Sequence, residues 1–437
     1  MNYLRGLIGI AVLIFIAYLF SSYRKKIDWK LVAAGIILQV VIAILVLRVP
    51  IIRNAFEAIG SGFVKFLGFA AYGAEFLFGD LARNSDVATH SRHNLGFLFA
   101  FQALPTVIFF SSVTSGLYYL GILQKIVYGF AWIMAKTMRL SGAESLSAAG
   151  NIFLGQTEAP LLVRPFIGKM TQSELHCLMT GGMATIAGSV MGAYITFLGG
   201  TDPEQLVKFA TYLLCASIMN APAAIVMSKI FLPETEPEKI DKSLRVNKDA
   251  IGVNVVDALA SGAADGLKLA LNIGAMLLAF IAVIYALNWI LVDGIGSWTG
   301  LNAWVVESTG GAFNGFSLQY IFGQIFRLFA FAMGVYWSET LQVGSLLGQK
   351  MVINEFVAYL SLADMKEAGL LSEKSIIISS YAVCGFANFS SIAIQIGGIG
   401  GMAPNRQSDL SRLGMKALLA ASLATMMSGT IAGALFG

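Results

Sequence analysis

Charged residues are scarce in this sequence. Only 12% of its 437 residues are Asp, Glu, Lys or Arg, against about 25% in soluble globular domains, and 57% are hydrophobic. This composition excludes an ordinary soluble domain and is typical of an all-α polytopic membrane protein. Lys and Arg exceed Asp and Glu by only 29 to 25, which gives no argument for a nucleic-acid partner.

Cysteines and catalytic motifs are also sparse. Cys177, Cys215 and Cys384 lie in apolar segments without close spacing, so we expect reduced packing residues rather than a disulfide framework. His90 and His93 form the only close histidine pair and lack neighbouring ligands, so no metal site is predicted there. The absence of HExxH, GxSxG and P-loop motifs argues against an enzyme.

Residues 1–120 are expected to form N-terminal scaffold helices. An apolar stretch at 4–21 runs into Arg24–Lys26, which indicates a signal anchor with the N-terminus outside and the basic loop in the cytoplasm. Charged residues mixed with apolar ones over about 51–81 favour a helix in the membrane interface. The remaining predicted elements are a span at 31–48, a polar loop at 83–94 and a span at about 95–120, kinked at Pro105.

A polar stretch, Asn151–Pro160 (NIFLGQTEAP), interrupts very apolar sequence. Its carboxylate, amide and hydroxyl are costly to bury alone, so protein groups, water, an ion or cargo must meet them. A capping box at Ser141–Glu144 predicts the start of a short helix, and a second short apolar piece ends at Ile167. Because neither piece reaches the roughly 20 residues that span a bilayer, we predict a re-entrant hairpin at about 144–167.

The same layout occurs twice. In the first repeat, 121–232, the hairpin precedes a span at about 172–199 that glycines and Thr185 interrupt. A cytoplasmic connection at 233–265 follows, and then a scaffold helix with an outer loop at 266–315, whose part from 293 onward contains no Lys or Arg.

The second repeat covers 316–437. It has a predicted hairpin at about 341–362 with Glu355 at its break, a span at about 374–398 interrupted around Asn388, and a last helix. Counting spans, the first hairpin enters from the cytoplasm and the second from outside, so the repeat is inverted. Inverted repeats with discontinuous helices indicate a secondary transporter, although channels also contain broken helices.

Four motifs in order resemble the concentrative nucleoside transporter family over nearly the whole chain. They are Gly155–Pro160 (GQTEAP), Ala187–Ser189 (AGS), Asn354–Tyr359 (NEFVAY) and Cys384–Ser391 (CGFANFSS). The resemblance is to the bacterial, sodium-coupled type. It implies about eight spanning helices, two oppositely directed re-entrant hairpins, an interfacial helix and a homotrimer in a lipid bilayer.

The resemblance also implies site residues. The family's nucleobase contacts fall on Gln156, Thr157, Glu158 and Val190, its ribose contacts on Glu355, Asn388 and Ser391, and Phe386 packs beside the nucleoside. Carboxylate and amide groups suit a base edge and sugar hydroxyls, because hydrogen bonds to charged groups are strong. For Val190 and Phe386, ordinary packing is an equal alternative.

The family's sodium site falls on the side chains of Asn151 and Thr185 and the backbone carbonyls of Leu154 and Ile186. Sodium prefers oxygen ligands, and unwound backbone at membrane depth provides them. Proton-coupled relatives lack these side-chain oxygens, whereas both are present here, which favours sodium. A helix threonine can also simply bond its own backbone.

Together these observations predict a sodium-coupled nucleoside symporter of the inner membrane, with uridine-like pyrimidine nucleosides favoured and both termini outside. It would work by alternating access. The alternatives are a proton-coupled nucleoside transporter and, less in keeping with the motifs, a membrane-embedded enzyme that uses the paired carboxylates.

Overall fold

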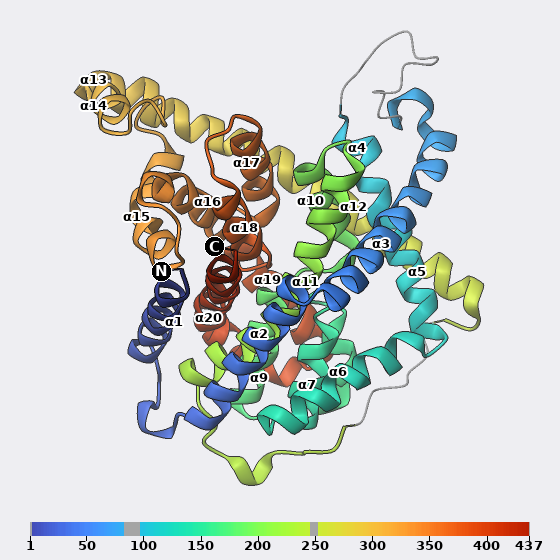
Figure 1. The fold of residues 1–437 in the computed structure, drawn as a ribbon. Coiled ribbons are helices and arrows are strands. Elements are labelled where there is room, and N and C mark those ends of the chain that lie inside the picture. The colour runs from blue at the N-terminus through green and yellow to red at the C-terminus, as the bar shows by residue number, and fades with distance from the viewer. Residues whose placement is uncertain (1, 83–96, 245–251, 437) are drawn as a thin grey trace.

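The computed structural model describes residues 2–82, 97–244 and 252–436, which form helices and connections without strands (Figure 1). The polar loop predicted at 83–94, with His90 and His93, lies outside the described residues. Before the first repeat the helices are α1 (Asn2–Leu19), α2 (Trp29–Arg48), α3 (Pro50–Phe78), α4 (Phe99–Gln102) and α5 (Leu104–Tyr119).

The two repeats occupy most of the rest of the chain. The first contains α6 (Ile122–Met138), α7 (Gly142–Gly150), the 3-10 helix η3 (Ala159–Val163), α8 (Arg164–Ile167), α9 (Gln172–Ala184), α10 (Gly188–Gly199) and α11 (Pro203–Phe231). Then come α12 (Val255–Asn288), the π-helical segment η5 (Trp289–Gly296), α13 (Ser297–Thr299) and α14 (Leu301–Ser308). The second repeat contains α15 (Leu318–Ala332), α16 (Thr340–Val352), α17 (Glu355–Glu367), α18 (Glu373–Val383), α19 (Phe389–Met402) and α20 (Gln407–Leu435).

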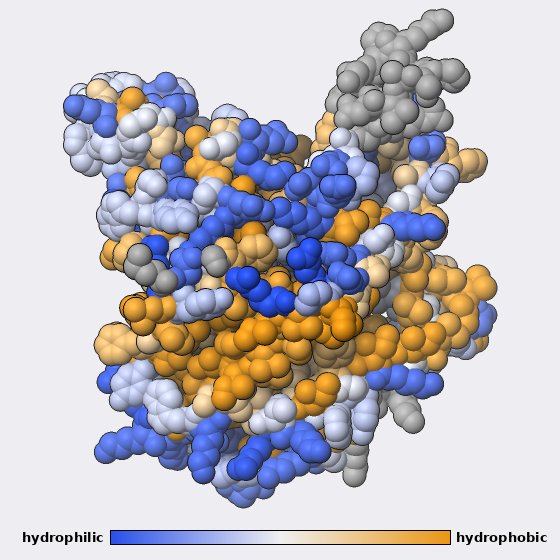
Figure 2. Space-filling view, in the orientation of Figure 1, coloured by the Kyte–Doolittle hydropathy of each residue, from blue (hydrophilic) through white to orange (hydrophobic). Residues whose placement is uncertain are grey.

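Within the described ranges, 7 helical segments are long and apolar enough to cross a membrane. The segment formed by α18 and α19 is the expected eighth crossing, and its two halves are each too short to be counted alone. An apolar band crosses the face seen in Figure 2, between more hydrophilic surfaces. The all-α membrane fold predicted from composition is therefore confirmed.

Two segments differ from the sequence-based boundaries. Helix α12 begins at Val255 instead of about 266, because the Asn254 side chain caps it by accepting a hydrogen bond from the Asp257 amide at 2.9 Å. The predicted outer loop is helical as far as Ser308. There Asn302 donates to the Val292 carbonyl at 2.9 Å and so ties α14 to η5.

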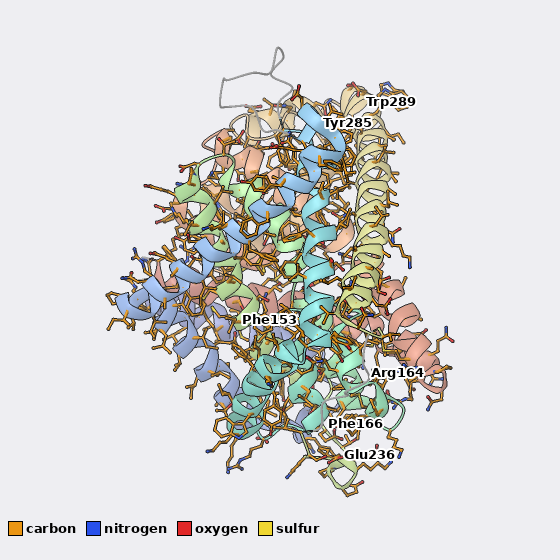
Figure 3. All side chains as sticks on the ribbon, turned by 90° about the vertical axis from the view of Figure 1, so that its right-hand side faces the viewer. Phe153, Arg164, Phe166, Glu236, Tyr285 and Trp289 are labelled. Atoms are coloured by element: carbon orange, nitrogen blue, oxygen red, sulfur yellow. The ribbon has the colours of Figure 1, made fainter. Side chains whose placement is uncertain are left out.

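The core lies in the repeats. About nine-tenths of the apolar windows in the segments Gln172–Gly199, Pro203–Phe231 and Pro404–Leu435 are buried, against 11% in Val255–Thr299. Small residues allow close approach in the buried helices, but α12 carries a similar share of Gly, Ala and Ser, so its exposure reflects its peripheral position in the fold. Helices α5 and α12 pack against each other on the periphery (Figures 1 and 3), where Gly262 and Gly266 face the backbone of α5.

Candidate substrate and ion site

The first hairpin (residues 142–167) is opened by the predicted capping box. The Ser141 hydroxyl accepts from the Glu144 amide at 3.1 Å, and the Glu144 carboxylate accepts from the Ser141 amide at 3.2 Å. The helix ends at Gly150, after which turns closed by bonds such as Leu154 N to Gly150 O, 2.9 Å, carry the chain to η3. Regular helix is therefore missing where the polar residues occur.

The second hairpin (residues 340–367) is interrupted more sharply. Helix α16 ends at Val352 and α17 begins at Glu355, with the Asn354 side chain accepting from the Val357 amide at 3.0 Å. Helix α17 continues to Glu367, beyond the predicted end at 362. Its last turn is held by Lys366, which donates to the Leu198 carbonyl of α10 at 2.7 Å.

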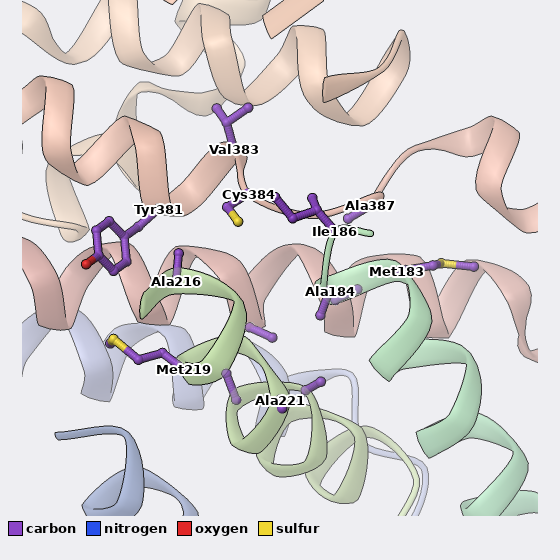
Figure 4. Packing of buried hydrophobic residues seen from close by; sticks show 14 of the residues in the cluster. Met183, Ala184, Ile186, Ala216, Met219, Ala221, Tyr381, Val383, Cys384 and Ala387 are labelled. Carbon is purple, nitrogen blue, oxygen red and sulfur yellow. The ribbon is translucent and has the colours of Figure 1, made fainter. Parts of the chain in front are cut away.

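Two interrupted helices meet at their breaks (Figure 4). The chain leaves helical geometry between α9 and α10, and again between α18 and α19. The Phe386 amide donates to the Thr185 carbonyl at 3.2 Å, which joins one break to the other. A Cβ on Gly385 would lie 2.7 Å from the Ala184 carbonyl oxygen, so this close approach requires glycine.

One polar cluster joins the first hairpin to α19. Gln156 Nε2 donates to Ser391 Oγ at 3.1 Å, and Gln395 Nε2 donates to Gln156 Oε1 at 3.2 Å and to the Met179 carbonyl at 3.0 Å. A backbone carbonyl can only accept, so the amide of Gln395 is oriented by Met179. Gln395 in turn directs the Gln156 NH2 group toward Ser391.

A second cluster surrounds Glu355. Its carboxylate accepts from the Tyr194 hydroxyl and from Asn388 Nδ2, both at 2.9 Å. Asn388 also caps α19, because its side-chain oxygen accepts from the Ser391 amide at 2.9 Å. Tyr194 stacks on Tyr359 with ring centroids 4.4 Å apart. The structure therefore brings Glu355, Asn388 and Ser391 together, as the resemblance implied.

The other nucleoside-site candidates are less tightly connected. Thr157 and Glu158 are half-buried, and Glu158 Oε2 has no hydrogen-bond partner within the described residues. The carboxylate folds back over Gly155, where a Cβ would overlap it. Val190 is buried in α10 and Phe386 is partly buried, and neither side chain bonds to the two polar clusters.

Tyr194 and Gln395 were missed by the sequence reasoning. Each is a large polar side chain in a mainly apolar helix, and this was the available signal. Neither lies in the four motifs, and their roles depend on which residues of the other repeat they contact.

The sodium-site candidates lie where the non-helical turn of the first hairpin, Asn151–Glu158, meets the interruption between α9 and α10, and the Gly188 amide joins the two by donating to the Phe153 carbonyl at 3.1 Å. We call this region the first break, and the region where the turn before Glu355 meets the interruption between α18 and α19 the second break.

Asn151 is 1% exposed, yet neither polar atom of its side chain has a hydrogen-bond partner in the described chain. Its Nδ2 lies 3.1 Å from the position of a Cβ on Gly181, so the amide faces the last turn of α9. Thr185 Oγ1 donates to the Gly181 carbonyl at 2.9 Å, which leaves the oxygen lone pairs available.

The backbone at this break offers further oxygens. Among the described residues, no hydrogen bond reaches the carbonyls of Leu154 or Ile186. Buried carbonyls are nearly always paired, so these two atoms fit a ligand that supplies positive charge. An oxygen-rich set without a carboxylate suits a monovalent cation better than a divalent one.

The first break lies inside the molecule between its two ends. In Figure 3, Phe153 lies between the end marked by Arg164, Phe166 and Glu236 and the end marked by Tyr285 and Trp289. Unwound backbone is tolerated at such depth only where protein or a cavity satisfies it.

The chain was next compared with known proteins. Family models described as "Na+ dependent nucleoside transporter" C-terminus and N-terminus match residues 212–433 and 8–81, and a model described as "Nucleoside recognition" matches 100–201. The chain belongs to the concentrative nucleoside transporter family. It is a multi-pass membrane transporter, not an enzyme.

Members of the family resemble the chain over its full length. An uncharacterized transporter of Haemophilus influenzae is 44% identical, with 100% of this chain and 99% of that protein covered. Sodium/nucleoside cotransporter 1 of Mus musculus is 39% identical over 98% of this chain, which spans 63% of the mouse protein. The structure of CNTnw in an inward-facing substrate-bound state matches with a TM-score of 0.88 at 42% identity, covering 100% of this chain and 98% of that one. A CNTnw double variant in an outward-facing state also has a TM-score of 0.88, at 41% identity.

Proposed function

We propose that this transporter imports nucleosides in symport with sodium. The observation that carries the proposal is Asn151, whose buried amide has two unpartnered polar atoms beside Thr185 and two unbonded backbone carbonyls. Unpartnered polar atoms in a buried site are costly, and a bound sodium ion would satisfy the oxygens. The same ion would order the Gln156–Glu158 segment that follows Asn151.

The nucleoside would bind where the two polar clusters meet. Gln156, Thr157 and Glu158 would contact the base, and Glu355, Asn388 and Ser391 the ribose, beside Val190 and Phe386. A nucleoside would have to separate Gln156 from Ser391, which lie in direct contact here at 3.1 Å. We propose a pyrimidine nucleoside such as uridine as the cargo.

Transport would proceed by alternating access with two oppositely directed re-entrant hairpins. One sodium moving inward with a neutral nucleoside carries one charge, and a membrane potential of 100 mV then contributes about 2.3 kcal/mol to accumulation. CNTnw structures exist in inward-facing and outward-facing states, and the match to both supports two such states here.

Charge distribution supports an inner-membrane orientation with both termini outside. In Figure 1 the chain termini lie at the ends of α1 and α20 that point away from the loop containing Arg24–Lys26. That loop lies at the same end of the molecule as the connection that follows α11. The positive-inside rule then assigns this basic end to the cytoplasm.

The proposal includes a homotrimer. Helix α12 is very apolar and hardly buried within one chain. Such a surface suits lipid or a second copy of the chain. Native mass spectrometry or mass photometry of the detergent-solubilised protein tests this part, and a purely monomeric mass would contradict it.

The decisive experiment is uptake of labelled uridine into proteoliposomes with an inward sodium gradient or an inward proton gradient. Accumulation that requires sodium would support both the nucleoside as cargo and sodium as the coupling ion. Accumulation driven by protons alone would keep the nucleoside and reject the Asn151 ion site. If uridine is not taken up, adenosine, cytidine and inosine are tested in the same vesicles, and failure of all four would reject nucleoside import.

A further inference from the structure

Three Lys and Arg side chains are buried within the described residues, and one of them differs from the others. Lys229 forms an ion pair with Glu144, and Arg406 forms one with Asp409 at 2.8 Å. Lys350, which is 3% exposed, forms no ion pair in the described part of the chain. Because buried charges are normally paired with opposite charge, the placement of Lys350 needs another explanation.

The hydrogen-bond partners of Lys350 are neutral oxygens. Its ammonium group donates to the Ala382 carbonyl at 2.9 Å and to Thr425 Oγ1 at 2.7 Å. The Thr425 hydroxyl uses its own proton on the Ser422 carbonyl at 3.0 Å, so its oxygen acts as an acceptor for Lys350. Oxygen ligands without a carboxylate are also what the first break offers to sodium.

Ala382 lies in the last turn of α18, where this helix is interrupted. The last carbonyls of a helix lack partners and carry the negative end of its dipole. Lys350 itself lies in the last turn of α16, the first arm of the second hairpin. Its ammonium therefore links the hairpin to the negative end of the interrupted helix.

The first repeat has the same arrangement without a cation from the protein. Asn151 directly follows α7, the first arm of the first hairpin, and faces the last turn of α9 at Gly181. Helices α7 and α9 thus correspond to α16 and α18. A neutral, unpartnered amide in the first repeat takes the place of a charged ammonium in the second.

We propose that Lys350 is a fixed internal cation, which does in the second repeat what the coupling sodium does in the first. It offsets the negative end of α18 and holds the second hairpin against α18 and α20. The second half of the site, including Glu355, is then ordered without an ion. The inference rests on the proposed sodium site for the role of the first break, but the need for positive charge at Lys350 is testable alone.

The first test replaces Lys350 with methionine, which is uncharged and of similar size. Uptake by Lys350→Met should fall by about a hundredfold or more, because the variant leaves the buried Ala382 carbonyl without a donor and the negative end of α18 without a cation. The matched control is Lys366→Met, since Lys366 also donates to a helix-end carbonyl, that of Leu198 in α10, but is only half-buried. Its uptake should stay within about threefold of wild type.

The second test restores the positive charge without the lysine side chain. Lys350→Ala is assayed with ethylammonium, a small cation able to fill the vacated space, and with ethanol as the uncharged probe. Ethylammonium should raise uptake by this variant at least about tenfold and raise its midpoint of thermal unfolding, while ethanol changes neither. The sodium concentration for half-maximal uptake by the rescued variant should equal that of wild type.

Full transport by Lys350→Met would overturn the proposal. The proposal would also be overturned if Lys350→Ala gained neither uptake nor thermal stability from ethylammonium. This second result decides the matter even if Lys350→Met does not fold. Wild-type sodium dependence is measured in the same vesicles. Sodium-independent wild-type uptake would reject the coupling proposal, whereas the charge requirement at Lys350 is still decided by the variants.

Discussion

The two repeats have similar helices, but they differ in whether the buried polar groups at their breaks have hydrogen-bond partners. At the first break, Asn151 and Glu158 retain polar atoms without partners in the described structure. At the second, Glu355 accepts two hydrogen bonds and Lys350 donates two. Satisfied polar networks are rigid, whereas unsatisfied ones depend on what binds to them. The polar groups of the second hairpin are thus satisfied within the protein, whereas those of the first hairpin are not.

Each repeat also inserts one side chain into the other. Tyr194 of the first repeat donates to Glu355, and Gln395 of the second orients Gln156. The site therefore belongs to neither repeat alone. Substitutions in the two repeats should therefore have different effects. They range from loss of nucleoside uptake to a change in KM alone.

The largest effects are expected at the two acidic residues. Glu355→Gln would turn an acceptor of two hydrogen bonds into a group that presents its own N–H donors to Tyr194 or Asn388, and Glu158→Gln would remove the charge at the first hairpin. We expect each variant to lose nucleoside uptake by about a hundredfold or more, since bonds to buried charges are worth about 1.5–3 kcal/mol each. Uptake in proteoliposomes measures this. Gel filtration of the purified variants controls for folding, and near-normal transport by both would contradict the site.

Substitutions of Thr185 test the proposed ion site separately from the nucleoside site. Thr185→Val keeps the shape but removes an oxygen at the first break, whereas Thr185→Ser keeps the oxygen. We expect the valine variant to need about tenfold more sodium for half-maximal uptake and the serine variant to resemble wild type. An equal sodium requirement in both variants would show that Thr185 only bonds its own helix.

Replacing Lys229, the lysine of the first repeat that forms an ion pair, should lower the stability of the fold. Lys229 contacts Glu144 and donates to Ser173 Oγ at 2.9 Å, next to the start of the first hairpin. Lys229→Met leaves the buried Glu144 carboxylate without an opposite charge, which should destabilise the protein by about 3 kcal/mol. Thermal unfolding in detergent measures the change. The double variant Lys229→Met with Glu144→Leu should recover part of it, and a double variant less stable than the single one would contradict this explanation.

The smallest effect is expected at Gln395. Gln395→Leu removes the bond that orients Gln156, worth about 1 kcal/mol, so KM for uridine should rise roughly fivefold. The sodium requirement and the maximal rate should stay close to wild type. A change in the sodium requirement instead would mean that Gln395 supports the first break and not the nucleoside.

The sequence alone determined the helical membrane fold and the position of both breaks. Polar residues in very apolar surroundings predicted the interruptions, and the Ser141–Glu144 capping box predicted the start of the first hairpin. These features are local, because they depend on residues close in sequence. Boundaries set by a single cap, such as Asn254 at α12, escaped notice because nearby polar residues resembled a connection.

How the breaks are joined and how their polar groups are bonded became visible only in the folded molecule. The pairing of Tyr194 with Glu355 spans 161 positions, and that of Gln395 with Gln156 spans 239. The contrast between unpartnered Asn151 and bonded Lys350 likewise depends on which helix ends face them. Hydrogen bonds between distant segments follow from packing, which residue spacing along the chain does not encode.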